Sequence, residues 1–212
     1  SETEDIDWQN NWKEFFKAFT IDDILIKPTW EELKEEDKGR ILIEIDPGVS
    51  FGTGKHETTQ LCIKQLIKYI EGAKEAPTVL DVGCGSGILA ITAALLGAQE
   101  IKGCDIDEVA VKVAGENAQL NGVSDRIAFH RGDLTSQVEG SFQLICANIV
   151  ADVIIRLSED VGKYLAEGGT FITSGIIDTR EQDVLDALEK NGFEVIERRS
   201  SSGWVALACR AK

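Results

Sequence analysis

The chain of 212 residues contains no methionine, not even an initiator, so we expect a processed or shortened chain. It also lacks any apolar run close to the ~20 residues that a membrane-spanning helix needs. The N-terminus is acidic and polar, unlike a secretory signal. We therefore expect a cytoplasmic protein without a membrane partner. The length predicts one domain, or one domain plus an extension.

Basic residues are scarce, because 22 Lys and Arg oppose 37 Asp and Glu and give a net charge of −15. Nucleic-acid binding depends on cationic contacts to phosphates, so this balance argues against a direct nucleic-acid partner. The charge is compatible with a basic protein as partner, although solubility alone explains it more simply. The apolar fraction of 43% is sufficient for a sizeable core.

The cysteines show neither a disulfide pattern nor a metal-binding pattern. Their number is odd, their spacing is wide, and no C-x-x-C pair occurs among Cys62, Cys84, Cys104, Cys146 and Cys209. This usage predicts reduced, buried thiols and no metal site. For Cys84, which lies in a glycine turn, filling tight space is a better interpretation than a nucleophilic role. The sequence leaves the oligomeric state open.

The most informative stretch runs from Val79 to Ala90 and reads V-L-D-V-G-C-G-S-G-I-L-A. It predicts a buried strand, a glycine turn and a helix start, and Asp105 follows 22 residues after Gly83. In a nucleotide-binding βαβ unit, glycines let the ligand approach the backbone and the acid accepts from ribose hydroxyls. Ile88 replaces the third glycine of a dinucleotide fingerprint, which argues against a pyrophosphate and a dehydrogenase. The pattern favours a binding site for a nucleoside without phosphates over a turn that binds no ligand. S-adenosylmethionine (AdoMet) is the commonest cofactor of that kind.

Strands and helices alternate along most of the chain. Strands are predicted at 41–45, 78–83, 100–105, 127–131, 142–147, 170–174, 193–199 and 204–210. Helices are predicted at 57–71, 87–97, 108–121, 152–165 and 179–191. The alternation predicts an α/β fold with a doubly wound, mostly parallel sheet covered on both faces. The last two strands share only the connection Ser200 to Gly203, so they must be antiparallel.

The N-terminal region is expected to be an extension. Aromatic residues at helical spacing predict a short amphipathic helix over residues 5–19, which would pack on the main domain or join a further domain upstream. The charged segment 31–38 is interpreted as a solvated loop or short helix. We accordingly divide the chain into an N-terminal extension or linker (1–45) that packs on the main domain and a cofactor-binding domain (46–212).

Polar residues and glycines follow four of the predicted strands, where open α/β sheets bind ligands. They are Gly83, Gly85, Asp105, Asp107, Asp133 and Asn148. Asp105 should make a charge-assisted contact to both ribose hydroxyls. Asp133 could accept from the adenine amine or cap the next segment.

Asn148 is the catalytic candidate. The alternative is that Asn148 serves only as a turn residue at the end of its strand. If AdoMet is the methyl donor and an amine is the acceptor, as the family resemblance described below implies, the amine must attack in line and must be neutral. A free lysine has a pKa of ~10.4, so holding it neutral at pH 7 costs on the order of 4–5 kcal/mol. The Asn148 oxygen and a neighbouring carbonyl could accept the hydrogens of the amine and aim its lone pair, which supplies orientation more than acid–base chemistry.

A glycine-rich loop from Asp46 to Thr59 precedes the binding unit and reads D-P-G-V-S-F-G-T-G-K-H-E-T-T. Its glycines suggest a lid over the methionine end of the cofactor. A Walker-type phosphate loop fits poorly, because no hydroxyl residue follows Lys55. His56 is expected to anchor the loop through a hydrogen bond rather than act as a base. Thr59 could cap its helix or contact the cofactor carboxylate.

These motifs together resemble the PrmA family, the methyltransferases of ribosomal protein L11. The resemblance covers the chain from about Trp8 to its end. It rests on the loop, the glycine stretch, D-I-D at Asp105–Asp107 and A-N-I at Ala147–Ile149. The glycine stretch alone indicates only a class I AdoMet-dependent methyltransferase, whereas the loop combined with A-N-I is much more specific.

The resemblance implies a Rossmann-like seven-stranded sheet with an antiparallel last strand and AdoMet as cofactor. It implies transfer of methyl groups to lysine side chains and the N-terminal amine of a large-subunit ribosomal protein. Family cofactor contacts fall on Thr59, Gly83, Asp105 and Asn148, and the expected set also includes Phe51, Gly85 and Asp133. It further implies an upstream domain that grips the substrate and is expected to be missing here. The alternatives are a methyltransferase of another amine or small molecule, and a nucleoside-binding module without turnover.

Overall fold

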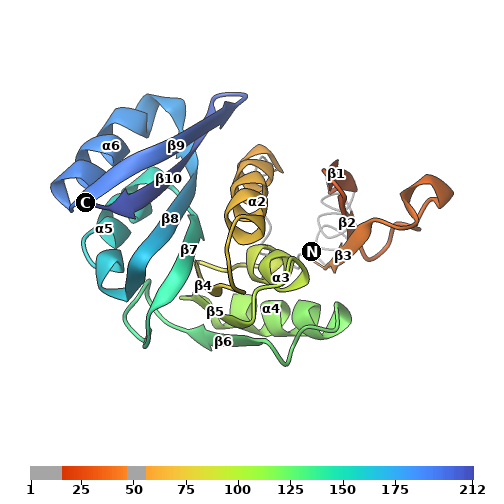
Figure 1. Cartoon of the computed structure of the whole chain (residues 1–212). Helices are drawn as coiled ribbons and strands as arrows, with labels where there is room; N and C mark the ends of the chain where they lie inside the picture. Colours follow the sequence, from red (N-terminus) through yellow and green to blue (C-terminus); the bar gives the residue numbers. More distant parts are fainter. Residues whose placement is uncertain (1–15, 47–55) are drawn as a thin grey trace, which may run out of the picture.

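The computed structural model describes residues 16–46 and 56–212, and its centre is a seven-stranded sheet (Figure 1). The strands are β4 (Thr78–Val82), β5 (Glu100–Asp105), β6 (Ile127–Arg131), β7 (Phe142–Asn148), β8 (Leu165–Ile177), β9 (Phe193–Ser201) and β10 (Trp204–Ala211). They lie in the order β6-β5-β4-β7-β8-β10-β9. The first five strands in this order run parallel to one another, and β10 runs antiparallel to both of its neighbours. The predicted α/β fold with its antiparallel last strand is confirmed.

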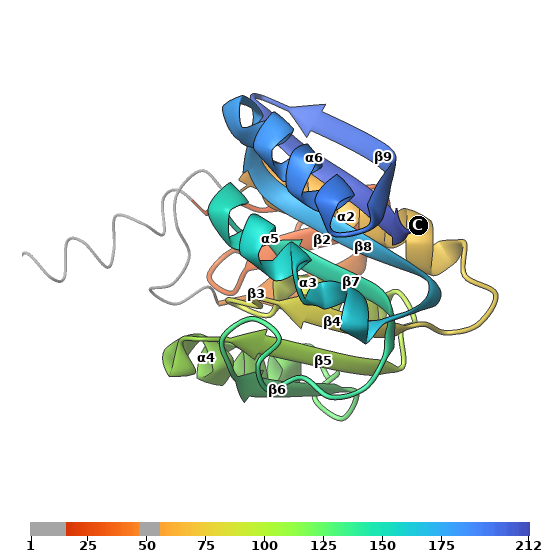
Figure 2. The ribbon, with the colours of Figure 1, turned by 90° about the vertical axis from the view of Figure 1, so that its left-hand side faces the viewer.

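Helices cover both faces of this sheet (Figure 2). One face carries α2 (His56–Glu71), α3 (Ile88–Leu95) and α4 (Glu108–Leu120), and the other carries α5 (Ala151–Ser158) and α6 (Glu181–Lys190). The short 3-10 helices are η2 (Glu35–Asp37), η4 (Val161–Tyr164) and η5 (Asp178–Arg180). Each face has its own apolar core, because Leu66 and Ile91 belong to one buried cluster and Ile154 and Leu188 to the other.

Helix α3 lies in the more crowded of the two layers. Its residues from Ile88 to Ala94 are all buried and all but Thr92 are apolar, so the helix is apolar on nearly every side. A helix that is apolar all round is stable only when it is enclosed. The chain enters it through Gly87, whose φ of 85° lies in the left-handed region that favours glycine. The apolar run of the glycine stretch therefore forms a buried helix directly beneath the glycine turn.

A second, three-stranded sheet lies N-terminal to α2. It consists of β1 (Phe19–Ile21), β2 (Ile24–Pro28) and β3 (Ile41–Ile45), with β2 antiparallel to β1 and parallel to β3. Its buried isoleucines, among them Ile26 and Ile43, belong to the same apolar cluster as α2 and α3. The N-terminal sheet is therefore packed directly on the helical layer of the larger sheet.

The helix predicted over residues 5–19 is wrong at its C-terminal end, and residues 1–15 lie outside the described part of the chain. Residues 16–18 have no regular secondary structure, and Phe19 begins a strand. Phe16 is only 1% exposed, and its ring meets Trp30 edge-on at 6.1 Å between centroids. This tertiary contact outweighs the helical spacing of the aromatic residues, as packing often outweighs local propensity.

The helix predicted over 152–165 is also too long. Helix α5 ends at Ser158, a 3-10 turn follows, and β8 starts at Leu165. Leu165 pairs with Phe142 of β7, so strand pairing takes the residues that periodicity assigned to the helix. The other predicted helices and strands lie within a few residues of the observed ones, apart from β8, which is much longer than the predicted 170–174.

Candidate functional site

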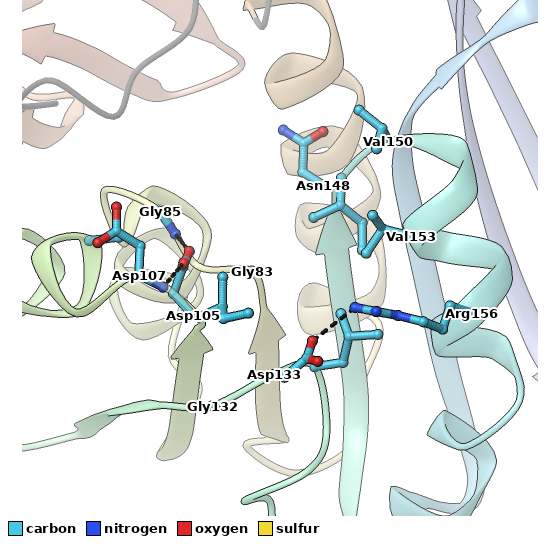
Figure 3. Close-up of a pocket in the computed structure, with 14 residues that line it drawn as sticks. Gly83, Gly85, Asp105, Asp107, Gly132, Asp133, Asn148, Val150, Val153 and Arg156 are labelled. Atoms are coloured by element: carbon cyan, nitrogen blue, oxygen red, sulfur yellow. Dashed lines mark hydrogen bonds and ion pairs between the residues drawn. The ribbon is translucent and has the colours of Figure 1, made fainter.

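A pocket of about 450 Å³ opens beyond the carboxyl ends of β4, β5, β6 and β7 (Figure 3). From β4 the chain builds outward through β5 and β6 on one side and through β7 and β8 on the other. Such a reversal of strand order is where open α/β sheets bind their ligands. The volume lies within the ~300–1,000 Å³ of small-molecule sites. The lining residues are Gly83, Gly85, Asp105, Ile106, Asp107, Ala110, Gly132, Asp133, Leu134, Asn148, Ile149, Val150, Val153 and Arg156.

The glycine turn between β4 and α3 forms one wall of the pocket. Gly83 and Gly85 have φ values of 72° and 51°, in the region that side chains other than glycine rarely adopt. A Cβ on Gly83 would lie 2.8 Å from Cγ2 of Ile149, whereas a Cβ on Gly85 would meet nothing within 4 Å. Gly83 therefore permits close packing against Ile149, the residue that follows β7, and Gly85 leaves its side of the pocket open for a ligand.

Asp105 projects into the pocket with its carboxylate already oriented (Figure 3). Its Oδ2 accepts a hydrogen bond from the Gly85 amide at 3.0 Å, and its Oδ1 accepts one from the Asp107 amide at 2.9 Å. An ionised carboxylate has about four lone-pair sites, so acceptor capacity remains for ligand hydroxyls. Asp107 in turn caps α4, because its Oδ1 accepts from the Val109 amide at 2.9 Å.

Asn148 ends β7 at the rim of the pocket, and helix α2 holds its amide. Its Nδ2 donates to Oγ1 of Thr59 at 3.3 Å. Thr59 is 3% exposed and lies behind Asn148 rather than among the residues that line the pocket. The hydroxyl of Ser174 in β8 donates to the carbonyl of Thr58 at 2.7 Å, which fixes the same end of α2. Three elements therefore determine how the Asn148 amide faces the pocket.

Asp133 and Arg156 close the opposite side of the pocket (Figure 3). Nη2 of Arg156 lies 2.8 Å from Oδ1 of Asp133, which joins the loop after β6 to α5. The turn after Asp133 is closed by its backbone, since Ser136 N donates to Asp133 O at 3.0 Å. Arg156 could not be identified from the sequence, because a single arginine on an amphipathic helix is typical of a solvated surface.

Burial controls the titratable groups beneath the turn. Asp81 is 1% exposed, and this burial, aided by the charge of Asp105, raises the pKa of its carboxyl to about 7 despite a hydrogen bond from the Ala90 amide. Burial also raises the pKa of the Cys84 thiol well above its usual range. A protonated thiol is a poor nucleophile, which agrees with Cys84 as a residue that fills tight space. All five cysteines are buried and unpaired, as predicted.

The structure brings together around one pocket all six residues predicted at the strand ends, namely Gly83, Gly85, Asp105, Asp107, Asp133 and Asn148. Thr59 contacts Asn148 from behind. Phe51 lies outside the described residues, and His56 is the first residue of α2. His130 is in β6, away from the pocket lining, and burial lowers the pKa of its imidazole.

Residues 16–46 and 56–212 contain neither a metal-binding cluster nor a membrane-spanning helix. No group of three or more His, Cys, Asp and Glu side chains there is arranged to hold a metal ion. None of the helices in these ranges is both long and apolar enough to span a lipid bilayer.

The strand order, the antiparallel β10 and a pocket formed by a glycine turn and an acid define a Rossmann-like methyltransferase fold. Similar solved structures include a tRNA methyltransferase of Bacillus subtilis, which is 17% identical with a TM-score of 0.60 and covers 71% of this chain and 65% of its own. At that identity the likeness concerns the fold alone.

Closer matches identify the family. The family described as ribosomal protein L11 methyltransferase (PrmA) matches residues 1–212, and the chain belongs to it. It is 55% identical to the ribosomal protein L11 methyltransferase of Agathobacter rectalis, over 99% of this chain and 68% of the relative. The corresponding protein of Carboxydothermus hydrogenoformans is 48% identical over 99% of this chain and 68% of its own length. The crystal structure of the L11 methylase from Lactobacillus delbrueckii subsp. bulgaricus is similar with a TM-score of 0.84 and 34% identity, over 93% of this chain and 99% of that one.

Proposed function

We propose that the protein transfers methyl groups from AdoMet to amino groups of ribosomal protein L11, both lysine side chains and the N-terminal amine. The observation that carries the proposal is the Asp105 carboxylate, oriented in the pocket by two backbone amides beside the open face of Gly85. The PrmA family membership supplies the substrate class. A ribosomal-protein substrate would place the reaction in the cytoplasm.

The pocket residues fit a nucleoside cofactor. The free lone pairs of Asp105 are suited to two vicinal ribose hydroxyls, a charge-assisted contact. The apolar side chains of Ile106, Val150 and Val153 line the pocket and suit a flat heterocycle. We assign Asp133 to the exocyclic amine of adenine, with its orientation maintained by Arg156. Gly83, Gly85, Thr59 and Phe51 complete the proposed set of cofactor contacts.

When bound, AdoMet would supply a methyl group activated by its sulfonium sulfur. The lone pair of a neutral substrate amine would take this methyl group, the sulfur would keep the electron pair of the broken carbon–sulfur bond, and the methylated ammonium would release its proton to solvent. Asn148 is proposed to accept a hydrogen bond from the neutral amine and to aim its lone pair. The protein thereby supplies proximity and orientation, which are worth a large share of a bimolecular barrier.

Calorimetry and a methylation assay test the proposal together. AdoMet and S-adenosylhomocysteine should bind, NAD should not, and label from methyl-labelled AdoMet should appear in ribosomal protein L11. Asp105→Ala should weaken AdoMet binding by about tenfold or more, since a hydrogen bond to a charged group is worth ~1.5–3 kcal/mol. NAD binding or an unchanged affinity in the Asp105 variant would contradict the cofactor assignment. Label in other amines but not in L11 would contradict the substrate.

A further inference from the structure

Asn117 of helix α4 and Asn121, the C-cap of that helix, bind the open edge of strand β3 and the residue after it as a neighbouring strand would. Oδ1 of Asn121 accepts from the Glu44 amide at 2.9 Å, and its Nδ2 donates to the Glu44 carbonyl at 2.7 Å. Asn117 repeats the pattern on Asp46, accepting from its amide at 3.0 Å and donating to its carbonyl at 2.9 Å. The other edge of β3 is paired with β2.

The repeat distances of the two elements explain why the pattern works. Residues four apart on a helix rise by about 6 Å, and residues two apart on a strand rise by about 6.6 Å. Glu44 and Asp46 therefore present their backbone groups at nearly the spacing of Asn121 and Asn117. An asparagine carries both an amide donor and a carbonyl acceptor, so it reproduces the peptide group that a strand would offer. Aspartate lacks the donor, and leucine lacks both.

Outside helix α4, Asn117 makes one hydrogen bond that Asn121 does not make. Its second amide hydrogen is donated to the carbonyl of Ser86 at 2.8 Å, and its side chain is buried at 2% exposure. Ser86 directly follows Gly85 in the glycine turn, and the Gly85 amide donates to the pocket carboxylate of Asp105. A continuous series of hydrogen bonds thus leads from the pocket through the turn to the backbone of Asp46.

We infer that Asn117 is a positioning residue that couples occupancy of the pocket to the N-terminal sheet (β1, β2 and β3). A ligand that binds Asp105 and Gly85 restrains the glycine turn, the turn restrains Asn117 through Ser86, and Asn117 restrains the end of β3. Such coupling is reciprocal, so disorder in the N-terminal sheet would also weaken ligand binding. The inference rests on the proposed function, which makes AdoMet the ligand of this pocket.

Asn121 provides a matched control, since Asn121→Ala removes the same pair of bonds to β3 and leaves the bond to Ser86 intact. Hydrogen exchange of the full chain is followed with and without saturating AdoMet, in the pocket segment 105–110 and in the N-terminal sheet. Calorimetry gives the Kd for AdoMet in each variant. Exchange in β2, which neither asparagine touches, reports on the sheet as a whole.

In the unsubstituted protein, AdoMet should slow exchange both in the pocket segment and in β2. Asn121→Ala should keep both effects and should bind AdoMet with a Kd within about twofold of the original. Asn117→Ala should keep the protection of the pocket segment, lose the protection of β2, and raise the Kd about two- to tenfold, the range expected for one lost hydrogen bond. Equal Kd values and equal protection of β2 in the two variants would overturn the inference.

Asn117→Asp extends the test if the alanine variant does not fold. It preserves the side-chain volume and the acceptor for the Asp46 amide but removes both amide hydrogens while it is ionised. Near pH 8 the variant should have a higher Kd for AdoMet than the unsubstituted protein. This difference should shrink as pH falls, because a protonated carboxyl again donates to a carbonyl. A Kd equal to that of the unsubstituted protein at every pH would overturn the inference. Absence of AdoMet binding in the unsubstituted protein would instead overturn the proposed function.

Discussion

Asn148 has a fixed orientation that its proposed role requires. Its amide nitrogen donates to Thr59, so the amide oxygen is the atom that can accept a hydrogen from a substrate. Figure 3 shows the amide above the pocket, on the side away from Asp133. A side chain held in this way loses little conformational freedom when the substrate binds.

Replacement of Asn148 tests its role in turnover. Asn148→Ala should lower kcat by ~10²-fold or more at saturating AdoMet, the scale seen when a positioned polar group is lost. Asn148→Asp should also be slow near pH 7 and should recover partly at higher pH, because a carboxylate holds the amine as an ammonium ion without a lone pair. Steady-state kinetics with ribosomal protein L11 measure both variants. An alanine variant with near-normal turnover would leave Asn148 as a turn residue.

Gly175 in β8 determines where the Asn148–Ile149 backbone can lie. Its φ is 89°, and a Cβ there would lie 2.6 Å from the Ile149 carbonyl and 3.0 Å from Oδ1 of Asn148. Gly175→Ala should therefore displace the amide and lower kcat on the order of tenfold or more, since small misplacements at a reacting centre are costly. The measurement is kcat at saturating AdoMet.

Gly168 is the matched control for Gly175, because it lies in the same strand. Its φ is 72°, but a Cβ there would meet nothing within 4 Å. Gly168→Ala should lose a similar ~1–2 kcal/mol of stability for the left-handed backbone and should keep its turnover. Equal losses of kcat in both variants would show that backbone strain, and not contact with Asn148, is responsible.

The location of the site residues could be predicted from sequence, because Gly83, Asp105, Asp133 and Asn148 each lie at or just beyond the carboxyl end of a strand. Carboxyl ends of parallel strands meet at one edge of a sheet, so distance along the chain does not matter. Arg156 could not be predicted, because its contact with the pocket depends on how helix α5 packs. Which atoms of the cofactor each residue contacts stays a prediction.

At the scale of elements, the alternating part of the chain was predicted well and the N-terminal part was not. Strand β2 reads Ile-Leu-Ile-Lys-Pro and is buried throughout. A short apolar run of that kind has neither the period of a helix nor that of a half-exposed strand, so periodicity does not identify it. Strand β3, also rich in isoleucine, was recognised because the turn residues Asp46-Pro47-Gly48 follow it.

Asp81 joins strand β4 to helix α3, and its burial lowers the free energy of unfolding by an amount that depends on pH. Its Oδ2 accepts from the Ala90 amide at 3.2 Å, and its Oδ1 is buried without a partner among the described residues. The pKa is about 7 in the folded protein, where burial raises it, against ~3.9 for an unfolded chain. Between these values the folded state binds more protons than the unfolded state. Stability should therefore fall as pH rises from about 4 to about 7.

Asp81→Asn should remove this part of the pH dependence, because an amide stays neutral and still accepts a hydrogen bond from the Ala90 amide. Urea unfolding at pH 5 and pH 8 measures the difference, and the original protein should lose more stability between the two than the variant. Asp125→Asn, which alters an exposed aspartate, is the control. The same loss in Asp81→Asn as in the original protein would show that Asp81 does not titrate in this range.

At the scale of the whole molecule, the net charge of −15 bears on how a protein substrate arrives. A negative surface attracts a substrate that presents lysines, and salt screens that attraction over about 8–10 Å. The value of kcat/KM for ribosomal protein L11 should therefore fall several-fold between low and high salt. The Kd for AdoMet in the same buffers is the control and should change less. A kcat/KM that does not depend on salt would show that the charge serves solubility alone.

Strand β10 has a consequence for the synthesis of the protein. It lies between β8 and β9, although it is translated after both, and β9 has no other partner in the sheet. A nascent chain that has not reached Trp204 therefore exposes an unpaired β8 edge that includes the buried residues Phe171 and Ile172. Unpaired apolar edges are templates for aggregation. A chain shortened before Trp204 should therefore aggregate more readily than the full chain, because the sheet cannot close without β10.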